Sequence, residues 1–528
     1  MAAVSTIEVF PGKWRVGEGG AEHAAALDSA GRSSALHDAI NDTESANANN
    51  TYVVHPGVYA PVVWGPILNP SYRIMAVPGA KPGEVVVDGG GTQCCIILPV
   101  NVYYSSGINM LQGLTLRNGY VRGGDGQRNQ GISSSGAAAF GVANFVDCLI
   151  EDCTSEYDAD ANAGGVGAVT QAYANNSILR LMSGCTMKRC RGLGSTGGWI
   201  AKSAIFHKCV FEDCVQDGAY ATAHPGVVSN CTFIRNRRCI SNTGTQLNSG
   251  ENPDADGSKR NVPEVVFNTR FVECSVPDNV NVCSCSFVYR NCLFQGCHGQ
   301  CINSGAAKHC TVIGHDYWWA MALVSNGFYP YYNYGALMIQ DCALDGSVFL
   351  NGAGASTRNA IVRHSVVVAN GARPNQNYPA IYQTGVSNWQ GSVTIDGCKT
   401  VDIDSSINDA AERRAKGLAN VRAVLRMDAE GHPRPGSAAI GMCDAADLAL
   451  EPLAVSTFEK WINATKAPAD DLNGLRALCD TIRAEAFESY KRTATHDLAG
   501  RPWRKRPAAG CFEFEGGNIP TRLSPMGM

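Results

Sequence analysis

A six-residue motif that recurs along the middle of the chain most constrains how it can fold. Each copy begins and usually ends with a small or polar residue, most often Cys, as in CLIEDC at 148–153 and CTMKRC at 185–190. Each copy has the length of a short strand rather than of a helix. Ten copies can be recognised, with starts 18 to 38 residues apart: 113, 148, 185, 209, 231, 269, 292, 310, 342 and 365.

This period suits one turn of a coil built from short strands. One coil cannot bury its own apolar face, but stacked coils can, each strand pairing with its equivalent about 4.8 Å above and below. Turn residues separate the copies, as in GLGSTGG at 192–198, and Gly makes up 57 of the 528 residues. The repeat therefore predicts an all-β parallel β-helix, a solenoid with small-residue columns inside.

Six further stretches carry a resemblance to a known group. They are ALHDAI at 35–40, TYVVHPGVY at 51–59, VVVDGG at 85–90, PGSAAI at 435–440, DLAGRP at 497–502 and GCFE at 510–513. With the repeat, they resemble the right-handed parallel β-helix proteins of the pectate-lyase-like superfamily, especially the uncharacterised bacterial and phage-associated branch. The resemblance implies the architecture. It does not imply one activity, because this fold hosts lyases, hydrolases, esterases, adhesins and tailspikes.

The sequence also predicts how the chain is organised. Residues 1–50 are expected to form an N-terminal strand and a capping helix, because an open first coil would expose unpaired strand edges. Residues 51–405 are expected to form the coils. Residues 406–528 are expected to form a C-terminal cap, with helical segments at 408–427 and 456–490 where Ala, Leu, Arg and Glu dominate.

The 22 cysteines raise the question of metal ligands or disulfides. The columns that hold Cys in some copies hold Ser, Thr, Asn or His in others, which favours buried free thiols over metal ligation. Neighbouring parallel strands also direct their Cβ atoms the same way, which disfavours disulfides between stacked coils. No cofactor is expected, apart from Ca²⁺ at Asp254 and Asp256 in a polar DADG loop, where an ordinary solvated turn is the alternative.

No catalytic signature of the superfamily's enzymes is found. The ordered polygalacturonase signature, N-T-D followed by G-H-G and then R-x-K, is absent, as is the W-x-D-H type of pectate lyases. GRPW at 500–503 matches one pectinesterase tetrapeptide, but that family's two aspartate-bearing motifs are missing. Whether the protein is an enzyme stays open. If it is one, it is expected to be a polysaccharide lyase or a glycoside hydrolase.

A dense aromatic run offers the best candidate contact surface. Eight aromatic residues fall within 317–334 of a chain that averages 8%. Such rings can stack on sugars or fill protein interfaces, so the run is predicted to contact a glycan or a neighbouring subunit. Packing of a long loop against the coils is the alternative. The five residues predicted to line this surface are Trp318, Trp319, Tyr329, Tyr331 and Tyr332.

The net charge and the absence of targeting signals limit the partners and the cellular location that the sequence predicts. A net charge of −4 argues against nucleic-acid binding through a basic surface. The first 20 residues show no signal peptide, and no apolar run is long enough for a membrane span. We expect a non-catalytic β-helix protein, extracellular, on the cell surface or on a virion, with a structural, carbohydrate-binding or partner-binding role. The alternative is a polysaccharide-degrading enzyme or a phage tailspike. Homo-oligomers are compatible with either.

Overall fold

The computed structural model describes 22 ranges of the chain. These are residues 5–42, 50–63, 72–97, 109–122, 137–140, 144–156, 165–166, 169–170, 181–192, 194–214, 220–241, 264–276, 281–283, 287–303, 305–324, 336–351, 359–372, 379–385, 392–450, 455, 459 and 474–514. The chain divides into two compact units. Unit 1 comprises Met1–Phe287, Tyr329–Asn333 and Glu451–Tyr490, and unit 2 comprises Val288–Phe328, Tyr334–Leu450 and Lys491–Met528.

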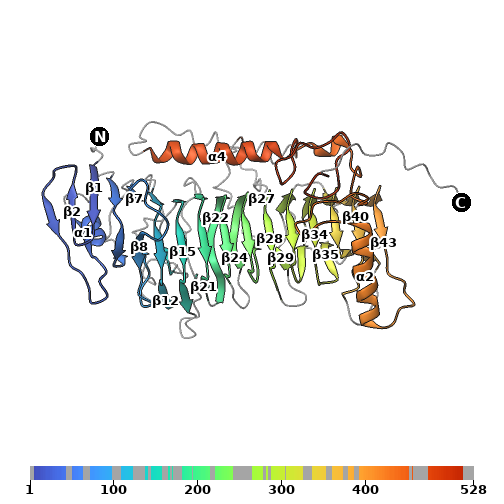
Figure 1. Ribbon diagram of the computed structural model, residues 1–528, viewed down its shortest axis with the longest axis horizontal. Helices are drawn as coiled ribbons and strands as arrows, with labels where there is room; N and C mark the ends of the chain where they lie inside the picture. Colours follow the sequence, from blue (N-terminus) through green and yellow to red (C-terminus); the bar gives the residue numbers. More distant parts are fainter. Residues whose placement is uncertain are drawn as a thin grey trace. The chain divides into compact units, whose positions relative to one another are not determined.

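Unit 1 consists of short strands that stack in parallel, coil upon coil (Figure 1). One stack contains β1 (Ser5–Phe10), β4 (Asn50–Val54), β7 (Tyr72–Ala76), β10 (Asn109–Gln112), β14 (Asn144–Val146), β19 (Leu181–Ser183), β22 (Gly194–His207), β24 (Tyr220–Ser229) and β27 (Glu264–Phe267). A second contains β5 (Gly57–Tyr59), β8 (Val85–Asp88), β11 (Thr115–Arg117), β15 (Leu149–Glu151), β20 (Thr186–Lys188), β23 (Val210–Glu212), β25 (Thr232–Ile234) and β28 (Arg270–Val272).

The remaining strands of unit 1 complete each coil. The long strands β22 and β24 also pair with a third stack, formed by β6 (Val62–Val63), β9 (Ile96–Ile97), β13 (Ala139–Phe140), β17 (Gly165–Val166), β18 (Val169–Thr170), β26 (Ile240–Ser241) and β29 (Asn281–Cys283). A small sheet contains β12 (Tyr120–Arg122), β16 (Thr154–Glu156) and β21 (Arg191–Gly192).

The N-terminal edge of unit 1 is closed as the sequence predicts. β1 pairs in parallel with β4 and antiparallel with β2 (Lys13–Val16), which pairs with β3 (Glu22–Ala24). Helix α1 (Ala35–Asn41) buries Leu36, Ala39 and Ile40 at the same end. A hairpin and a helix therefore protect the strand edge that a first coil would otherwise leave unpaired.

Unit 2 repeats the coil pattern. Its first stack contains β30 (Phe287–Arg290), β33 (Ala306–Lys308), β36 (Ala336–Gln340), β39 (Asn359–Arg363) and β42 (Val393–Asp396). Its second contains β31 (Leu293–Gln295), β34 (Thr311–Ile313), β37 (Ala343–Asp345), β40 (Val366–Val368) and β43 (Lys399–Val401). Its third contains β32 (Gln300–Asn303), β35 (Trp319–Val324), β38 (Ser347–Asn351) and β41 (Ile381–Thr384). All of these pairings are parallel. The predicted parallel β-helix is confirmed.

Each six-residue motif proves to be a corner, a strand and a second corner. In most copies the residue just before each end of the motif adopts a left-handed conformation, for example Asp147 (φ 52°) before Cys148 and Asp152 (φ 55°) before Cys153. The copy at 113–118 is offset by one residue, so its left-handed residues are the two ends themselves. Asn and Asp tolerate this conformation, but Lys208 (φ 55°) adopts it too. Its backbone N–H donates to Ser229 O at 2.9 Å, so the neighbouring coil holds the corner in place.

Between the two corners, one residue of each motif points into the interior. In unit 1 these residues come from β15, β20, β23, β25 and β28, and they lie in register in consecutive coils. They are Ile150, Met187, Phe211, Phe233 and Phe271, each with no exposed surface. The interior is thus a continuous apolar column flanked by the small residues at the ends of each motif.

The C-terminal region contains the helices that the sequence predicts. In unit 2, α2 (Ala410–Val424) begins after Asp409, whose side chain accepts a hydrogen bond from Glu412 N at 2.8 Å. The segment after α2 includes the short 3-10 helix η3 (Ala445–Leu448). α4 (Leu475–Arg492) lies within the predicted helical range 456–490 except for its last two residues. Of that range, residues 456–458 and 460–473 lie outside the described part.

α4 lies along one flank of unit 1 (Figure 1). It lies beside the corner residues that stand immediately before the motifs. Glu485 pairs with Lys208 at 2.9 Å, and Asn230 Nδ2 donates to Ser489 Oγ at 2.8 Å. The ring of Tyr490 packs edge-on against Phe267 at 5.1 Å. The helix therefore covers a row of corners from several successive coils.

Candidate functional site

A groove of about 730 Å³ opens on unit 1 beside the corner at the C-terminal end of the motif strands, where Asn118 and Asp152 lie. The loop before α1, β5, β8, β11, β12 and β16 contribute residues to its lining. Its charged side chains are Arg32, Asp88, Arg117, Asp152 and Glu156. The volume falls within the range of about 300–1,000 Å³ that is usual for ligand pockets, but the lining is unusually polar.

Asp88 is the most enclosed charged group of the groove. Arg117 Nε donates to its Oδ2 at 2.8 Å, Asn118 Nδ2 donates to Oδ1 at 3.2 Å, and Gly90 N donates to Oδ1 at 2.8 Å. Burial acts to raise the pKa of Asp88, but these hydrogen bonds outweigh it and hold the pKa below its usual value. Asp88 is therefore an ionised hydrogen-bond acceptor at neutral pH.

Gly90 is required by the geometry of this wall. Its φ of 63° lies in the left-handed region, and a Cβ there would come within 2.3 Å of Arg32 Nη1. Arg32 in turn donates to Asp88 O at 3.1 Å. The VVVDGG stretch at 85–90, which the sequence analysis used only as a mark of the fold, thus supplies both an acceptor and the turn that lets an arginine approach it.

Tyr120 and Glu156 form the opposite wall. They come from the paired strands β12 and β16, and the Tyr120 hydroxyl donates to Glu156 Oε2 at 2.8 Å. The ring of Tyr120 is half-buried, whereas Glu156 is exposed. This wall offers a polar tip and part of an aromatic ring to an occupant of the groove.

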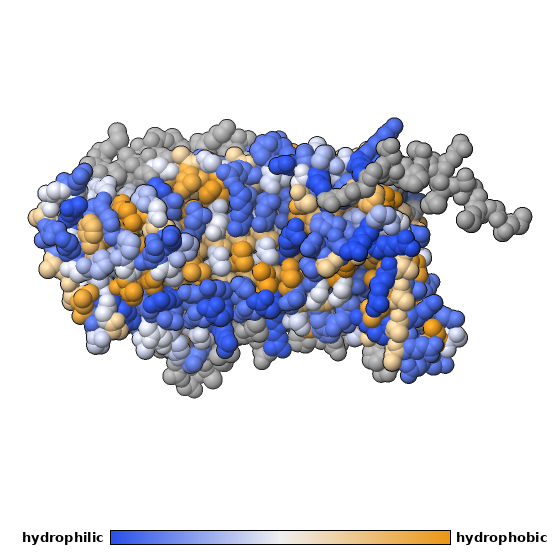
Figure 2. Space-filling model, in the orientation of Figure 1, coloured by the Kyte–Doolittle hydropathy of each residue, from blue (hydrophilic) through white to orange (hydrophobic). Residues whose placement is uncertain are grey.

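A row of exposed ion pairs continues from the groove along the second corner. Arg189 reaches both oxygens of Asp152, at 2.7 and 2.6 Å, and Arg235 reaches both oxygens of Asp213, at 2.8 and 2.9 Å. The hydrogen bond from Arg189 lowers the pKa of Asp152, so this carboxylate is also ionised at neutral pH. Figure 2 shows hydrophilic residues forming a band where Figure 1 labels β12 and β21.

Two of the five predicted aromatic residues lie in the described part of unit 2, and both are half-buried. Trp318 stacks on Tyr317 with ring centroids 3.9 Å apart, and Trp319, at the start of β35, stacks on Phe349 of β38 at 4.0 Å. Phe349 stacks in turn on Tyr382 of β41 at 5.8 Å. Tyr329, Tyr331 and Tyr332 lie outside the described residues, as do the calcium candidates Asp254 and Asp256.

The cysteines of the described part form no disulfide. All are buried except the half-buried Cys398. The thiols at the ends of the motif point inward and donate to carbonyl oxygens, as Cys185 Sγ does to Ser183 O at 3.3 Å. Burial raises the pKa of Cys185 and Cys209 well above the usual value, so these thiols stay protonated and unreactive at neutral pH.

Asp88, Arg117 and Tyr120 of the groove are not predicted as site residues from the sequence. Asp88, Arg117 and Tyr120 come from three different strands, and only the stacking of coils brings them together. A polar residue at the end of consecutive predicted strands was the available signal. It was ambiguous, because Asp and Asn are also ordinary turn residues.

No family model matches the chain, and no curated protein is similar enough to match. The parallel β-helix architecture is thus shown by the structure alone. Among the described residues, no helix is both long enough and apolar enough to cross a membrane.

Proposed function

We propose that this protein is a non-catalytic, glycan-binding β-helix protein of the pectate-lyase-like kind, displayed outside the cell, on the cell surface or on a virion. The groove of unit 1 is the observation that carries this proposal. Its walls combine the donors of Arg32, Arg117 and Tyr120 with the acceptors of Asp88 and Glu156. Sugar hydroxyls both donate and accept hydrogen bonds, so they match a lining of mixed polarity.

The state of the carboxylates favours binding over catalysis. A glycosidase needs one carboxyl group with a raised pKa to protonate the leaving oxygen. Asp88 and Asp152 have lowered pKa values because arginines pair with them. They can hold a hydroxyl group, but they are poor proton donors at neutral pH.

The balance of charge favours a neutral glycan. Two arginines and three carboxylates give the lining a formal charge of −1, and the whole chain carries −4. An acidic polysaccharide would therefore meet net repulsion. The same net negative charge argues against nucleic acid as a partner.

The aromatic row of unit 2 favours a second role, contact with a neighbouring protein subunit. Its rings stack on one another, so Trp319 and Phe349 use ring faces that a sugar would need. The edges of half-buried aromatic rings are common in protein interfaces. Trp318, Trp319, Tyr329, Tyr331 and Tyr332 are then proposed to take part in assembly, which includes homo-oligomers and a tailspike-like arrangement.

A glycan array followed by calorimetry tests the main proposal. The full chain should bind neutral glycans, and Arg117→Gln should weaken that binding about tenfold, or ~1.4 kcal/mol. Arg235→Gln is the matched control, because Arg235 pairs with acids on the same corner column but does not line the groove. Equal loss in both variants, or no glycan binding by the folded protein, would reject the groove as the site.

The same samples test the enzymatic alternative. The protein is incubated with each bound glycan, and the products are assayed for new reducing ends and for the ultraviolet absorbance of unsaturated sugars. We expect neither signal. Product release that Asp88→Asn or Glu156→Gln abolishes would show a glycosidase or lyase instead.

A further inference from the structure

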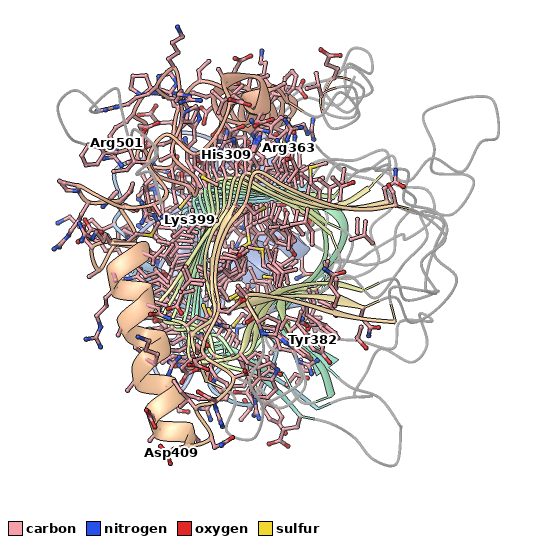
Figure 3. All side chains as sticks on the ribbon, turned by 90° about the vertical axis from the view of Figure 1, so that its right-hand side faces the viewer. His309, Arg363, Tyr382, Lys399, Asp409 and Arg501 are labelled. Carbon is pink, nitrogen blue, oxygen red and sulfur yellow. The ribbon has the colours of Figure 1, made fainter. Side chains whose placement is uncertain are left out.

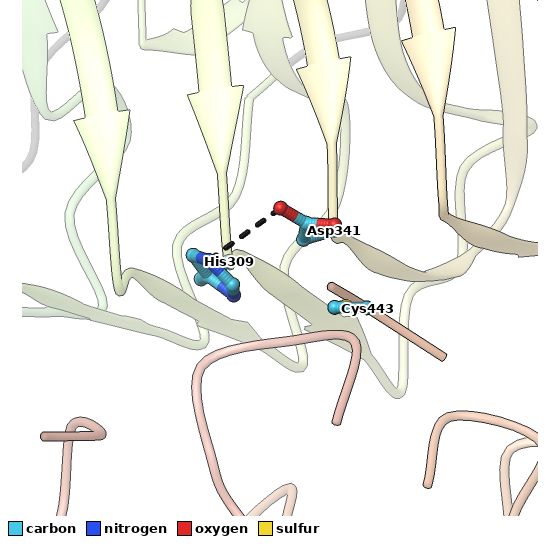
Figure 4. Close-up of side chains that lie close together, drawn as sticks. All are labelled: His309, Asp341 and Cys443. Atoms are coloured by element: carbon cyan, nitrogen blue, oxygen red, sulfur yellow. Dashed lines mark ion pairs between the residues drawn. The ribbon is translucent and has the colours of Figure 1, made fainter. Parts of the chain in front are cut away.

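Five side chains capable of binding a metal gather beneath the C-terminal segment of unit 2. His309, Asp341 and Cys443 each place one donor atom within 4.8 Å of the other two, and all three are buried (Figure 4). His364 and Asp447 adjoin them and form a second such group with Asp341. Figure 3 shows His309 and Arg363 at the same edge of the coils, on the side away from Tyr382.

The corners of the coil explain why these residues converge. His309, Asp341 and His364 occupy the same corner in three consecutive coils, with φ values of 49°, 56° and 46°. Corner side chains point away from the interior column, so these three point toward whatever covers the coils on this side. The chain after α2 supplies that cover, and with it Cys443.

The covering segment is firmly placed at this point. Gly510 N donates to Asp341 O at 2.7 Å, and Cys443 N donates to Pro507 O at 3.1 Å. The indole ring of Trp503 packs on the imidazole of His309, with centroids 5.0 Å apart. The donor atoms are therefore held together by backbone contacts on both sides and do not depend on a flexible loop.

The carboxylate of Asp341 is the second, independent sign of a ligand. The residue has no exposed surface, and neither oxygen accepts a hydrogen bond of ordinary geometry, although the adjacent thiol of Cys443 interacts with the carboxylate. The closest histidine nitrogens are Nε2 of His309 at 3.5 Å from Oδ2 and Nδ1 of His364 at 3.7 Å from Oδ1. A buried carboxylate without closer partners is unfavourable unless it takes up a proton or a cation compensates it.

We propose that unit 2 binds one Zn²⁺ ion through His309, Asp341 and Cys443. Zn²⁺ accepts this mixture of nitrogen, oxygen and sulfur donors, whereas Ca²⁺ and Mg²⁺ require oxygen. Ligand atoms around tetrahedral zinc lie about 3.5 Å apart, so the donors need to close in by a small side-chain movement. His364, whose Nδ1 lies 2.6 Å from Asp447 Oδ2 and 3.7 Å from Asp341 Oδ1, adjoins the three ligands.

The ion has a structural role. All three ligands are fully buried, as in structural zinc sites, which take a fourth protein ligand; His364, whose Nδ1 lies 3.7 Å from Asp341 Oδ1, is the neighbouring side chain that can supply it. Zinc would link two consecutive coils to the segment that covers them, and it would release the thiol proton of Cys443 on binding. This departs from the sequence-based expectation that most of the 22 cysteines are unliganded and that no metal beyond Ca²⁺ is bound.

Metal analysis of the wild-type chain is the first test. The protein is produced with added Zn²⁺, purified without a metal-affinity step and analysed for zinc per chain. We expect close to one Zn²⁺. Removal with a chelator should lower the melting temperature, and Zn²⁺ should restore it. Loading the stripped protein with Co²⁺ should produce the thiolate-to-cobalt charge-transfer band of a sulfur ligand.

Two variants locate the ion. Cys443→Ser should lose the charge-transfer band and bind Zn²⁺ at least a hundredfold more weakly, and His309→Gln should weaken binding similarly. Cys297→Ser, which changes a buried thiol of an interior column in the same unit, should keep both properties. The proposal is overturned if folded wild-type protein binds far less than one Zn²⁺, or if Cys443→Ser retains the cobalt band. The wild-type measurements decide the matter even if a variant does not fold.

Discussion

Phe211 and Phe233 occupy the same position in neighbouring coils, and their rings stack with centroids 4.7 Å apart and planes only 5° from parallel. Phe233 stacks equally on Phe271 of the next coil, at 5.1 Å. The ring of Phe233 therefore uses both of its faces, and the separation follows the spacing of paired strands. The apolar column of unit 1 is a series of contacts between immediate neighbours.

Removing the ring of Phe233 should destabilise unit 1. We expect Phe233→Ala to lower the free energy of unfolding by about 3–5 kcal/mol. The hydrogen bonds between stacked coils fix their spacing, so the cavity left by the ring cannot collapse. Urea unfolding followed by circular dichroism measures the change. Phe233→Leu, which keeps much of the volume, should lose clearly less. Similar losses in both variants would mean that the cavity collapses or that stacking matters little.

His207 makes unit 1 sensitive to acid. Burial lowers the pKa of His207 to about 4, from an unfolded value of 6.5, and the neighbouring Lys208 adds to the effect. The folded state thus binds fewer protons, so its stability falls as the pH drops from about 6.5 toward 4, by up to about 3 kcal/mol.

Unfolding midpoints at pH 7 and pH 4.5 measure this dependence. The shift should be smaller in His207→Gln than in the wild type, because the titrating group is gone. His298→Gln, which removes a half-exposed histidine of unit 2, is the comparison variant for the loss of a histidine elsewhere. The same pH dependence in His207→Gln and the wild type would assign the acid sensitivity to other groups.

Most thiols should be free. Because their Sγ atoms are buried and form no disulfide in the described part, we expect them to resist alkylation in the folded protein. After denaturation without reductant, a large majority of the 22 cysteines should react with iodoacetamide. Mass spectrometry counts the modified residues. A majority of blocked thiols would contradict the prediction.

Substitutions in the aromatic run should distinguish residues that pack the coils from residues that contact a partner. Trp319→Ala removes a ring stacked on Phe349 and is expected to destabilise unit 2 by about 3 kcal/mol. The triple change of Tyr329, Tyr331 and Tyr332 to Ala is expected to weaken association or glycan binding with little change in melting temperature. Calorimetry with analytical ultracentrifugation follows both. A large drop in melting temperature with unchanged binding would show that the tyrosines only pack the coils.

The fold could be predicted because its repeat is local. Cys148 and Cys153 mark the two ends of one strand, and copies of that pattern occur in consecutive coils. Helix α2 was predictable from composition over 408–427, and it spans Ala410–Val424. In both cases the signal lies within a few neighbouring residues.

The candidate sites could not be predicted in the same way. Asp88 and Arg117 lie 29 residues apart, and Asp341 and Cys443 are separated by 102 residues. Their proximity depends on the length of each coil and on where the C-terminal segment crosses the corners. Neither is set by short-range periodicity, and a lone His or Asp before a motif looks like any turn residue.

The left-handed corners have a consequence for how such proteins diversify. Because the corner N–H donates a hydrogen bond to a carbonyl of the next coil and so fixes the backbone there, even Lys208 and His309 are accommodated, and their side chains stay out of the interior. Selection can therefore exchange one corner residue without disturbing the column inside. Residues at consecutive corners form a row at the regular spacing of the strands. A new ligand set then needs only two substitutions in that row and one residue from the chain that crosses it.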